Sequence, residues 1–290
     1  MFDAFMIHTW IAATIIAATA GILGFFVVLR RSAFAAHALP LATFPGAAAA
    51  QLLGVQPLWG LLGFVSIAVV LLHQLQKLGR KDVAAGLVLV TLLAVGSLLL
   101  SMTNTYAPAV FSLLFGQVLG ISAADLWPVA VIASLVLMGA AVLYRPLLLQ
   151  SAFPELAISR GVSAGWIDIL FLSLLGLVTA MAMPVVGALL VFSLLIAPAA
   201  AAQSLSARPL QALLLSVMFS VGMIWTAIAL SFKTNWPIGF FVGAMGALLF
   251  TSARMCRYIR HRWFSRRTGA KPTRPMWLMP GAGPGESQVA

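Results

Sequence analysis

The chain has 290 residues, of which 62% are hydrophobic and only 8% are charged, and its mean hydropathy is +1.07. Soluble globular domains carry about 25% charged residues, so this composition cannot cover a water-facing surface and excludes a soluble enzyme. The single cysteine, Cys256, excludes an intrachain disulfide and a Cys-rich metal site. Residues 1–8 contain no Lys or Arg, so no cleaved signal peptide is expected. The sequence therefore predicts an all-α, polytopic membrane protein.

Runs of apolar residues long enough to cross a bilayer, about 20 residues each, predict about nine transmembrane helices, with eight or ten as alternatives. The runs are residues 10–29, 38–55, 58–75, 83–102, 126–144, 166–183, 185–202, 210–230 and 236–251. Pro40 and Pro45 interrupt the second run. A further apolar stretch, residues 106–121, is too short to span and is expected to form a partial or re-entrant helix.

The distribution of positive charge predicts the orientation. With the N-terminus outside, the cytoplasmic loops and tail hold 16 of the 17 Lys and Arg residues, and only Lys233 lies outside. Such an excess on the cytoplasmic side is typical of membrane proteins, so the C-terminus is expected in the cytoplasm. Two regions follow: a transmembrane domain, residues 1–253, and a tail, residues 254–290, that is first basic and then rich in Pro and Gly. The tail is expected to be disordered and to contact anionic lipid rather than nucleic acid.

Chemistry that would mark an enzyme or a proton-coupled carrier is missing. Asp168 is the only carboxylate inside an expected span, and it lies one turn from the end, where an acidic residue is interpreted as a cap or an interfacial group. A carrier needs a carboxylate near the middle of the membrane, and an intramembrane protease needs a zinc motif or a carboxylate pair. None of the four lysines follows a glycine, which excludes a Walker loop. No catalytic residue is therefore expected, and any ATP must be hydrolysed by another chain.

The longest internal cytoplasmic loop, about residues 145–165, contains a short predicted helix. Pro154 and Glu155 suit a helix start, because proline lacks only a donor that is unpaired there and an acidic side chain complements the helix dipole. Gly161 suits the helix end. Three apolar residues are then available to contact a partner: Phe153, Leu156 and Ala157. The loop taken alone fits a simple connector equally well.

At this loop the sequence resembles the coupling-helix region of metal-type ABC transporter permeases, the zinc, manganese and iron uptake family (ABC-3-like). The shared pattern is Pro-Glu-x-Ala-x-x-x-Gly-Val, here Pro154, Glu155, Ala157, Gly161 and Val162. Three further blocks resemble the family in a consistent order: residues 26–31, 113–126 and 186–200. The resemblance covers roughly residues 10–252, and four blocks in register make it strong.

The resemblance implies the permease subunit of an ATP-driven importer in the bacterial plasma membrane. Two copies of the permease are expected to pair, to bind cytoplasmic ABC ATPase subunits, and to receive substrate from an extracytoplasmic binding protein. ATP acts through the partner subunit, and no cofactor is expected on this chain. The residues expected to couple to the ATPase are Phe153, Pro154, Glu155, Leu156, Ala157, Gly161 and Val162. The residues expected along the translocation path are His37, Gln117, Gly187, Ser193 and Pro198.

The metal-ligand pattern of the family is only partly present. Members usually carry Asp-x-x-x-His at the start of the second span, a spacing that puts a carboxylate and an imidazole on one helix face. The two positions are His37 and Leu41 here, and the Asp or Asn that often follows Phe-Gly is Gln117. His37 is thus the candidate metal ligand, with Gln117 as a second donor, a pair acceptable to a borderline ion such as zinc. His37 also fits a polar residue near the inner interface.

The first hypothesis for the substrate is a divalent metal ion, zinc or manganese. A divergent permease for a metal chelate or another small ligand is an alternative. A membrane scaffold or sensor that binds its ATPase without transport is another. A polar track through His37 and Gln117 would favour transport, whereas a hydrophobic central cavity would favour the scaffold.

Overall fold

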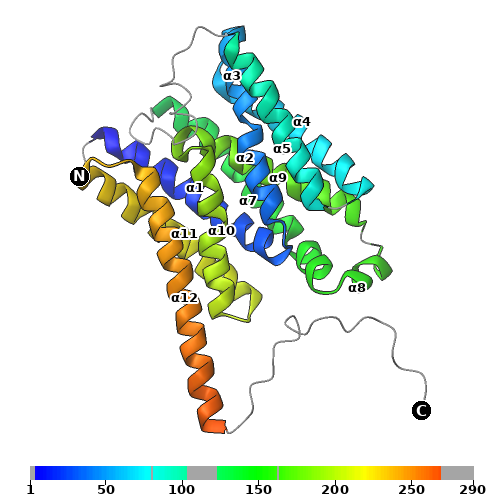
Figure 1. Cartoon of the computed structure of the whole chain (residues 1–290), viewed down its shortest axis with the longest axis vertical. Helices are drawn as coiled ribbons and strands as arrows, with labels where there is room; N and C mark the ends of the chain where they lie inside the picture. Colours follow the sequence, from blue (N-terminus) through cyan, green and yellow to red (C-terminus); the bar gives the residue numbers. More distant parts are fainter. Residues whose placement is uncertain (1–3, 80, 103–122, 162, 269–290) are drawn as a thin grey trace.

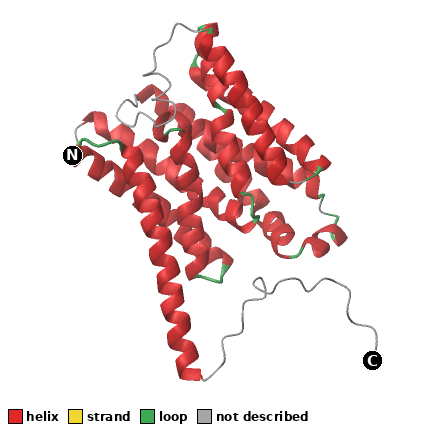
Figure 2. Ribbon diagram, in the orientation of Figure 1, coloured by secondary structure: helices red, strands yellow, loops and turns green. Residues whose placement is uncertain are grey.

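The computed structural model describes residues 4–79, 81–102, 123–161 and 163–268, and every regular element in these ranges is an α-helix (Figures 1 and 2). The helices are α1 (Ala4–Leu29), α2 (Ala33–Ala42), α3 (Phe44–Leu53), α4 (Pro57–Leu78), α5 (Lys81–Ser101), α7 (Ala123–Ala152), α8 (Pro154–Ser159), α9 (Ala164–Val186), α10 (Ala188–Leu205), α11 (Pro209–Thr234) and α12 (Ile238–Thr268).

Eight helical stretches in the described residues are long and apolar enough to cross a membrane, with α2 and α3 together forming one of them. The stretch expected at residues 185–202 corresponds to α10, whose apolar part, Leu190–Leu205, is shorter. The all-α, polytopic architecture predicted from composition is therefore confirmed. The re-entrant helix expected at residues 106–121 lies outside the described residues.

The second expected span is divided into two helices, as its prolines suggest. Pro40 lies inside α2, and Pro45 lies in the first turn of α3. Proline lacks the backbone N–H that continues a helix, and Thr43 occupies the junction. The Thr43 hydroxyl lies 2.6 Å from the carbonyl oxygen of Pro40 and contacts the sulfur of Met183 in α9. Most of this broken segment is buried within the bundle, and its two ends, at Phe34 and Leu53, are exposed.

A glycine separates α9 from α10. Gly187 has a φ of +87°, a conformation that residues with a Cβ rarely adopt. Its N–H donates to the carbonyl of Met183 at 2.9 Å, and its own carbonyl accepts from Val191 at 3.1 Å, so one residue closes α9 and opens α10. The chain then re-enters the bundle, where α10 packs against α1, α2, α11 and α12.

Small residues on α1 allow the closest helix contacts. A Cβ added at Gly24 would lie 2.0 Å from the carbonyl oxygen of Leu195 in α10, and one at Gly21 would lie 2.8 Å from the Cα of Val217 in α11. Polar side chains join the same helices: Ser216 donates to the carbonyl of Gly21 at 2.7 Å. Close backbone approach and interhelical hydrogen bonds stabilise bundles in lipid, where the hydrophobic effect does not favour helix association. These contacts fix α1 and α10 at the centre of the fold.

The last helix extends well past the membrane-spanning part expected from the sequence. The expected span ended at residue 251 and the transmembrane domain at residue 253, but α12 continues to Thr268. Figure 1 shows this helix projecting beyond the rest of the bundle. The first part of the basic tail is therefore helical. The disorder expected for the tail, residues 254–290, is thus wrong up to Thr268, and residues 269–290 lie outside the described residues.

Candidate coupling and translocation sites

The loop between α7 and α9 contains the short helix that the sequence predicts. Helix α8 begins at Pro154, with Glu155 in its first turn. Gly161 has a φ of +72°, a left-handed conformation that glycine adopts without a steric penalty, and it follows the helix end as expected. Val162 lies outside the described residues.

The apolar side chains around α8 are divided between the surface and the bundle. Phe153 is 64% exposed and Leu156 is 47% exposed, whereas Ala157 is only 2% exposed. Helix α8 packs on α7, with Ala157 against the protein and the two larger side chains facing outward. Large apolar side chains exposed among polar residues indicate a contact surface. We call this surface, Phe153–Gly161, the coupling loop.

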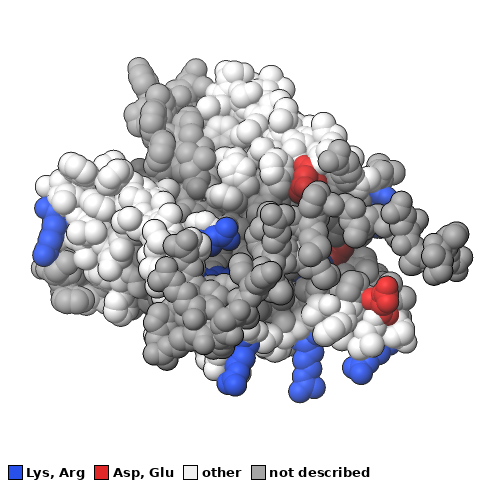
Figure 3. All heavy atoms as spheres, turned by 60° about the horizontal axis from the view of Figure 1, so that its bottom comes forward, with Lys and Arg blue, Asp and Glu red and all other residues white. Residues whose placement is uncertain are grey.

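A groove of about 660 Å³ lies beside the coupling loop. It is lined by Arg145, Pro146, Leu148, Leu149, Ala152, Phe153, Arg160 and Pro209. Its charged lining residues are both arginines, and the rest are largely apolar. Figure 3, which turns this end of the molecule forward, shows several Lys and Arg side chains and few acidic ones on the described surface. The groove is therefore suited to a partner segment that combines apolar and acidic side chains.

His37 lies on α2, where it borders α10. Its neighbours Ala36 and Ala38 are fully buried, whereas His37 itself is only partly buried. The imidazole meets the ring of Phe192 in α10 edge to face, with 4.8 Å between ring centroids. Leu41, one turn further along α2 at the position where the family usually has histidine, is 8% exposed and offers no ligand atom.

One face of α10 is less buried than the rest of the helix. Before its last turn, the partly exposed residues of α10 follow the helical spacing of one face: Phe192, Ser193, Ile196, Ala197 and Ala200. Ser193 lies against α12, since a Cβ added at Gly246 would lie 2.7 Å from its hydroxyl oxygen. We call His37 and this face of α10 the path surface.

The expected path residues do not all share this surface. His37 and Ser193 belong to it, but Gly187 and Pro198 are buried and lie on the opposite side of α10 by helical spacing. Gly187 forms the α9–α10 junction instead, and Gln117 lies outside the described residues. Across the described ranges, no group of three or more His, Cys, Asp or Glu side chains is arranged to hold a metal ion.

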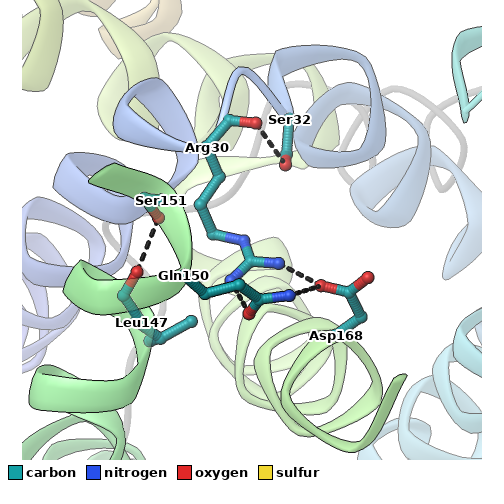
Figure 4. Close-up of polar contacts among 6 residues, drawn as sticks. All are labelled: Arg30, Ser32, Leu147, Gln150, Ser151 and Asp168. Atoms are coloured by element: carbon teal, nitrogen blue, oxygen red, sulfur yellow. Dashed lines mark hydrogen bonds and ion pairs between the residues drawn. The ribbon is translucent and has the colours of Figure 1, made fainter. Parts of the chain in front are cut away.

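A polar cluster that the sequence analysis missed joins three helices (Figure 4). Asp168 in α9 forms an ion pair with Arg30, which follows α1, and Arg30 also donates to Gln150 in α7 at 2.9 Å. Asp168 is therefore not a cap, since Ser163 occupies the N-cap of α9, and near this end of the helix it forms an ion pair. Burial lowers the pKa of the Arg30 guanidinium, and the charge and hydrogen bond of Asp168 oppose this shift. The position of Asp168 inside an expected span could have indicated this ion pair, because a carboxylate inside a membrane span usually pairs with a cation.

Comparison with known proteins identifies the family. The ABC 3 transport family matches residues 2–257. The chain is 33% identical over 200 residues to the manganese import system permease protein ScaB of Streptococcus parasanguinis, covering 68% of this chain and 71% of that protein. It is 32% identical over 213 residues to the manganese transport system membrane protein MntC of Halalkalibacterium halodurans, covering 72% of this chain and 73% of that protein.

A solved structure shares the fold. A chain of PsaBC from Streptococcus pneumoniae in complex with Fab has a TM-score of 0.78 and 24% identity, covering 87% of this chain and 91% of that chain. The resemblance stated from four sequence blocks is thus confirmed by a match over nearly the whole transmembrane region. The chain belongs to the ABC 3 transport family and is a multi-pass membrane permease subunit of an ABC transporter.

Proposed function

We propose that this permease imports manganese with the help of a separate ABC ATPase and an extracytoplasmic binding protein. The observation that carries the proposal is the extended similarity to permeases named for manganese import and transport, at 32–33% identity over 200 residues or more. In this proposal the manganese ion is the transported substrate. A supporting observation is that the imidazole of His37, the proposed ligand, lies where α2 borders the partly exposed face of α10.

The path surface contributes few ligands, which suits passage better than storage. A transport site must attract the ion and also release it, so weak binding at successive positions is favourable. His37 supplies one imidazole, and Ser193 supplies a hydroxyl on the same surface. The functional unit is proposed to be a homodimer, because the family resemblance implies two paired permease copies.

The proposed orientation places the coupling loop in the cytoplasm. Most loop cations lie on the side of the bundle that carries α8: Arg30, Lys77, Arg160 and Arg208 at helix ends or turns, and Arg145 within the last part of α7. Lys233 lies instead near the end of α11 that leads into α12. Cations concentrate on the cytoplasmic side of membrane proteins. The exposed Phe153 and Leu156 are then available to the ATPase, and the N-terminus lies outside.

We expect deletion of the protein to reduce cellular manganese when manganese is scarce, and the native chain to restore it. His37→Ala should restore uptake about tenfold less well, because losing even an indirect metal contact costs roughly 10- to 100-fold in affinity. His73→Ala is the matched control, since His73 is a partly buried histidine on α4 outside the path surface. Elemental mass spectrometry of the cells measures the result.

The other outcomes separate the competing functions. A selective loss of zinc instead of manganese would assign the permease to zinc. An unchanged metal profile, with the ATPase and binding protein expressed, would refute metal import and favour a chelate substrate or a scaffold. Equal restoration by His37→Ala and the native chain would remove His37 from the path.

A further inference from the structure

We propose that Arg30, Gln150 and Asp168 act as positioning residues that transmit movement of the coupling loop to α2, the helix that carries His37. We call these three residues the inner clamp. The proposal rests on the proposed function, because it assigns to the clamp the step between ATPase movement and opening of the path. None of the three residues needs to touch the transported ion.

The inner clamp closes the base of the hairpin that holds α8. Gln150 lies four residues before the start of α8, near the end of α7, and Asp168 lies in the second turn of α9. One guanidinium nitrogen of Arg30 donates to the Gln150 side-chain oxygen at 2.9 Å, and the other contacts Asp168 (Figure 4). The Gln150 amide also donates to the same Asp168 oxygen, at 3.5 Å. A planar guanidinium with several donors can bind the side chains of α7 and α9 at the same time, which an ammonium group does less well.

The surroundings make this contact stiff. The Arg30 side chain is 9% exposed and the Asp168 side chain is 20% exposed, so water competes little for their hydrogen bonds. The guanidinium also lies over the ring of Phe171, 5.0 Å from its centroid. Exposed ion pairs contribute little because solvent screens them, whereas a shielded and hydrogen-bonded pair defines one geometry and breaks at high cost. The end of α7 and the start of α9 are therefore expected to move together with Arg30.

Arg30 is joined to α2 by a tight turn. The N–H of Ser32 donates back to the carbonyl of Val27 at 2.9 Å, and Arg31 adopts the left-handed conformation with a φ of +54°. Helix α2 begins at Ala33, and His37 follows one turn later. A displacement of α8 thus reaches the inner end of α2 through a short series of hydrogen-bonded and covalent links. Coupling between sites travels through contiguous packed and hydrogen-bonded groups of this kind.

Asp168→Asn tests the clamp by removing the charge while keeping the side-chain shape. In proteoliposomes that contain the complete transporter, this variant should still bind the ATPase and hydrolyse ATP, but it should hydrolyse about tenfold more ATP for each manganese ion imported. Coupling free energies of ordinary size correspond to changes of roughly 5- to 150-fold. Asp82→Asn is the matched control, because Asp82 is an exposed acid lining the small cavity beside Arg30, and it should leave the ratio unchanged.

A distance measurement tests the same link without depending on the substrate. Spin labels at Ser159→Cys in α8 and Phe34→Cys in α2, in a Cys256→Ser background, report the separation of the two helices; both labelled positions and Cys256 are exposed. In the complex with native clamp residues, the separation should stay constant between nucleotide-free and ATP-trapped states, because α8 and α2 move together. In the Asp168→Asn variant it should change when ATP binds.

Each outcome decides the proposal. An unchanged ATP-to-manganese ratio in Asp168→Asn, loss of ATPase binding, or a changing separation in the native complex would overturn it. If Asp168→Asn does not accumulate in the membrane, Gln150→Leu is judged by the same measurements. This change removes the hydrogen bond from Arg30 to α7 and keeps the ion pair with Asp168. A native complex that moves no manganese but shows the constant separation would reject the proposed substrate and retain the clamp.

Discussion

Replacing Gly24 with alanine is expected to lower the thermal stability of the permease strongly. The added Cβ would lie 2.0 Å from the carbonyl oxygen of Leu195 and 2.9 Å from its carbonyl carbon. These are backbone atoms of α10, which cannot rotate away, so α1 and α10 must separate. Overpacking costs about 1–3 kcal/mol, and we expect the upper end of this range. The melting temperature should fall by roughly 6–12 °C.

The measurement is the loss of the monodisperse peak on size-exclusion chromatography after heating in detergent. Gly222→Ala is the matched control, because Gly222 lies in α11 and no described atom lies within 4 Å of an added Cβ. Alanine is the better helix former by about 1 kcal/mol, so this control should keep or slightly raise the melting temperature. Equal melting of the two variants would show that the contact between α1 and α10 tolerates separation.

Changes in the coupling loop are expected to disconnect ATP hydrolysis from transport while leaving the protein in the membrane. Gly161→Pro should have the largest effect on transport, because Gly161 has a φ of +72° and proline is restricted to a φ of about −65°. The turn after α8 cannot keep its shape, so Phe153 and Leu156 lose their position. Glu155→Arg should act similarly by placing a cation in the first turn of α8, where the helix dipole disfavours positive charge. We expect transport to fall at least about tenfold, in the range of ordinary coupling energies.

Co-purification of the ATPase and manganese uptake into proteoliposomes measure this effect. Gly161→Asn is the matched control, because asparagine is the residue besides glycine that most readily adopts the left-handed conformation, and it should keep much of the coupling. Membrane insertion should be equal in all three variants, since each change lies outside the expected spans. Normal ATPase binding and uptake in Gly161→Pro would refute the assignment of this loop.

The apolar spans and the short helix α8 were predictable from sequence because both depend on local physics. A helix in lipid must satisfy its own backbone and present apolar side chains along about 20 residues, so composition in a short window predicts it. Prolines 40 and 45 marked the break in the second span, and the Pro154–Glu155 start and Gly161 end bounded α8. The family followed from such local blocks, and the comparison over residues 2–257 confirmed it.

The inner clamp and the path surface depended on tertiary structure. Arg30 is separated from Gln150 by 120 positions and from Asp168 by 138, and no local pattern shows which of several cations lies beside a given acid. The sequence placed Gly187 and Pro198 with Ser193 in one path, but packing buries the first two and leaves Ser193 beside α12. Periodicity defines the faces of a helix, whereas the neighbours packed around it decide which face is open. The sequence by itself therefore determined the membrane class, most of the spans, the short helix α8 and the family, and the packing of the helices decided which polar residues meet.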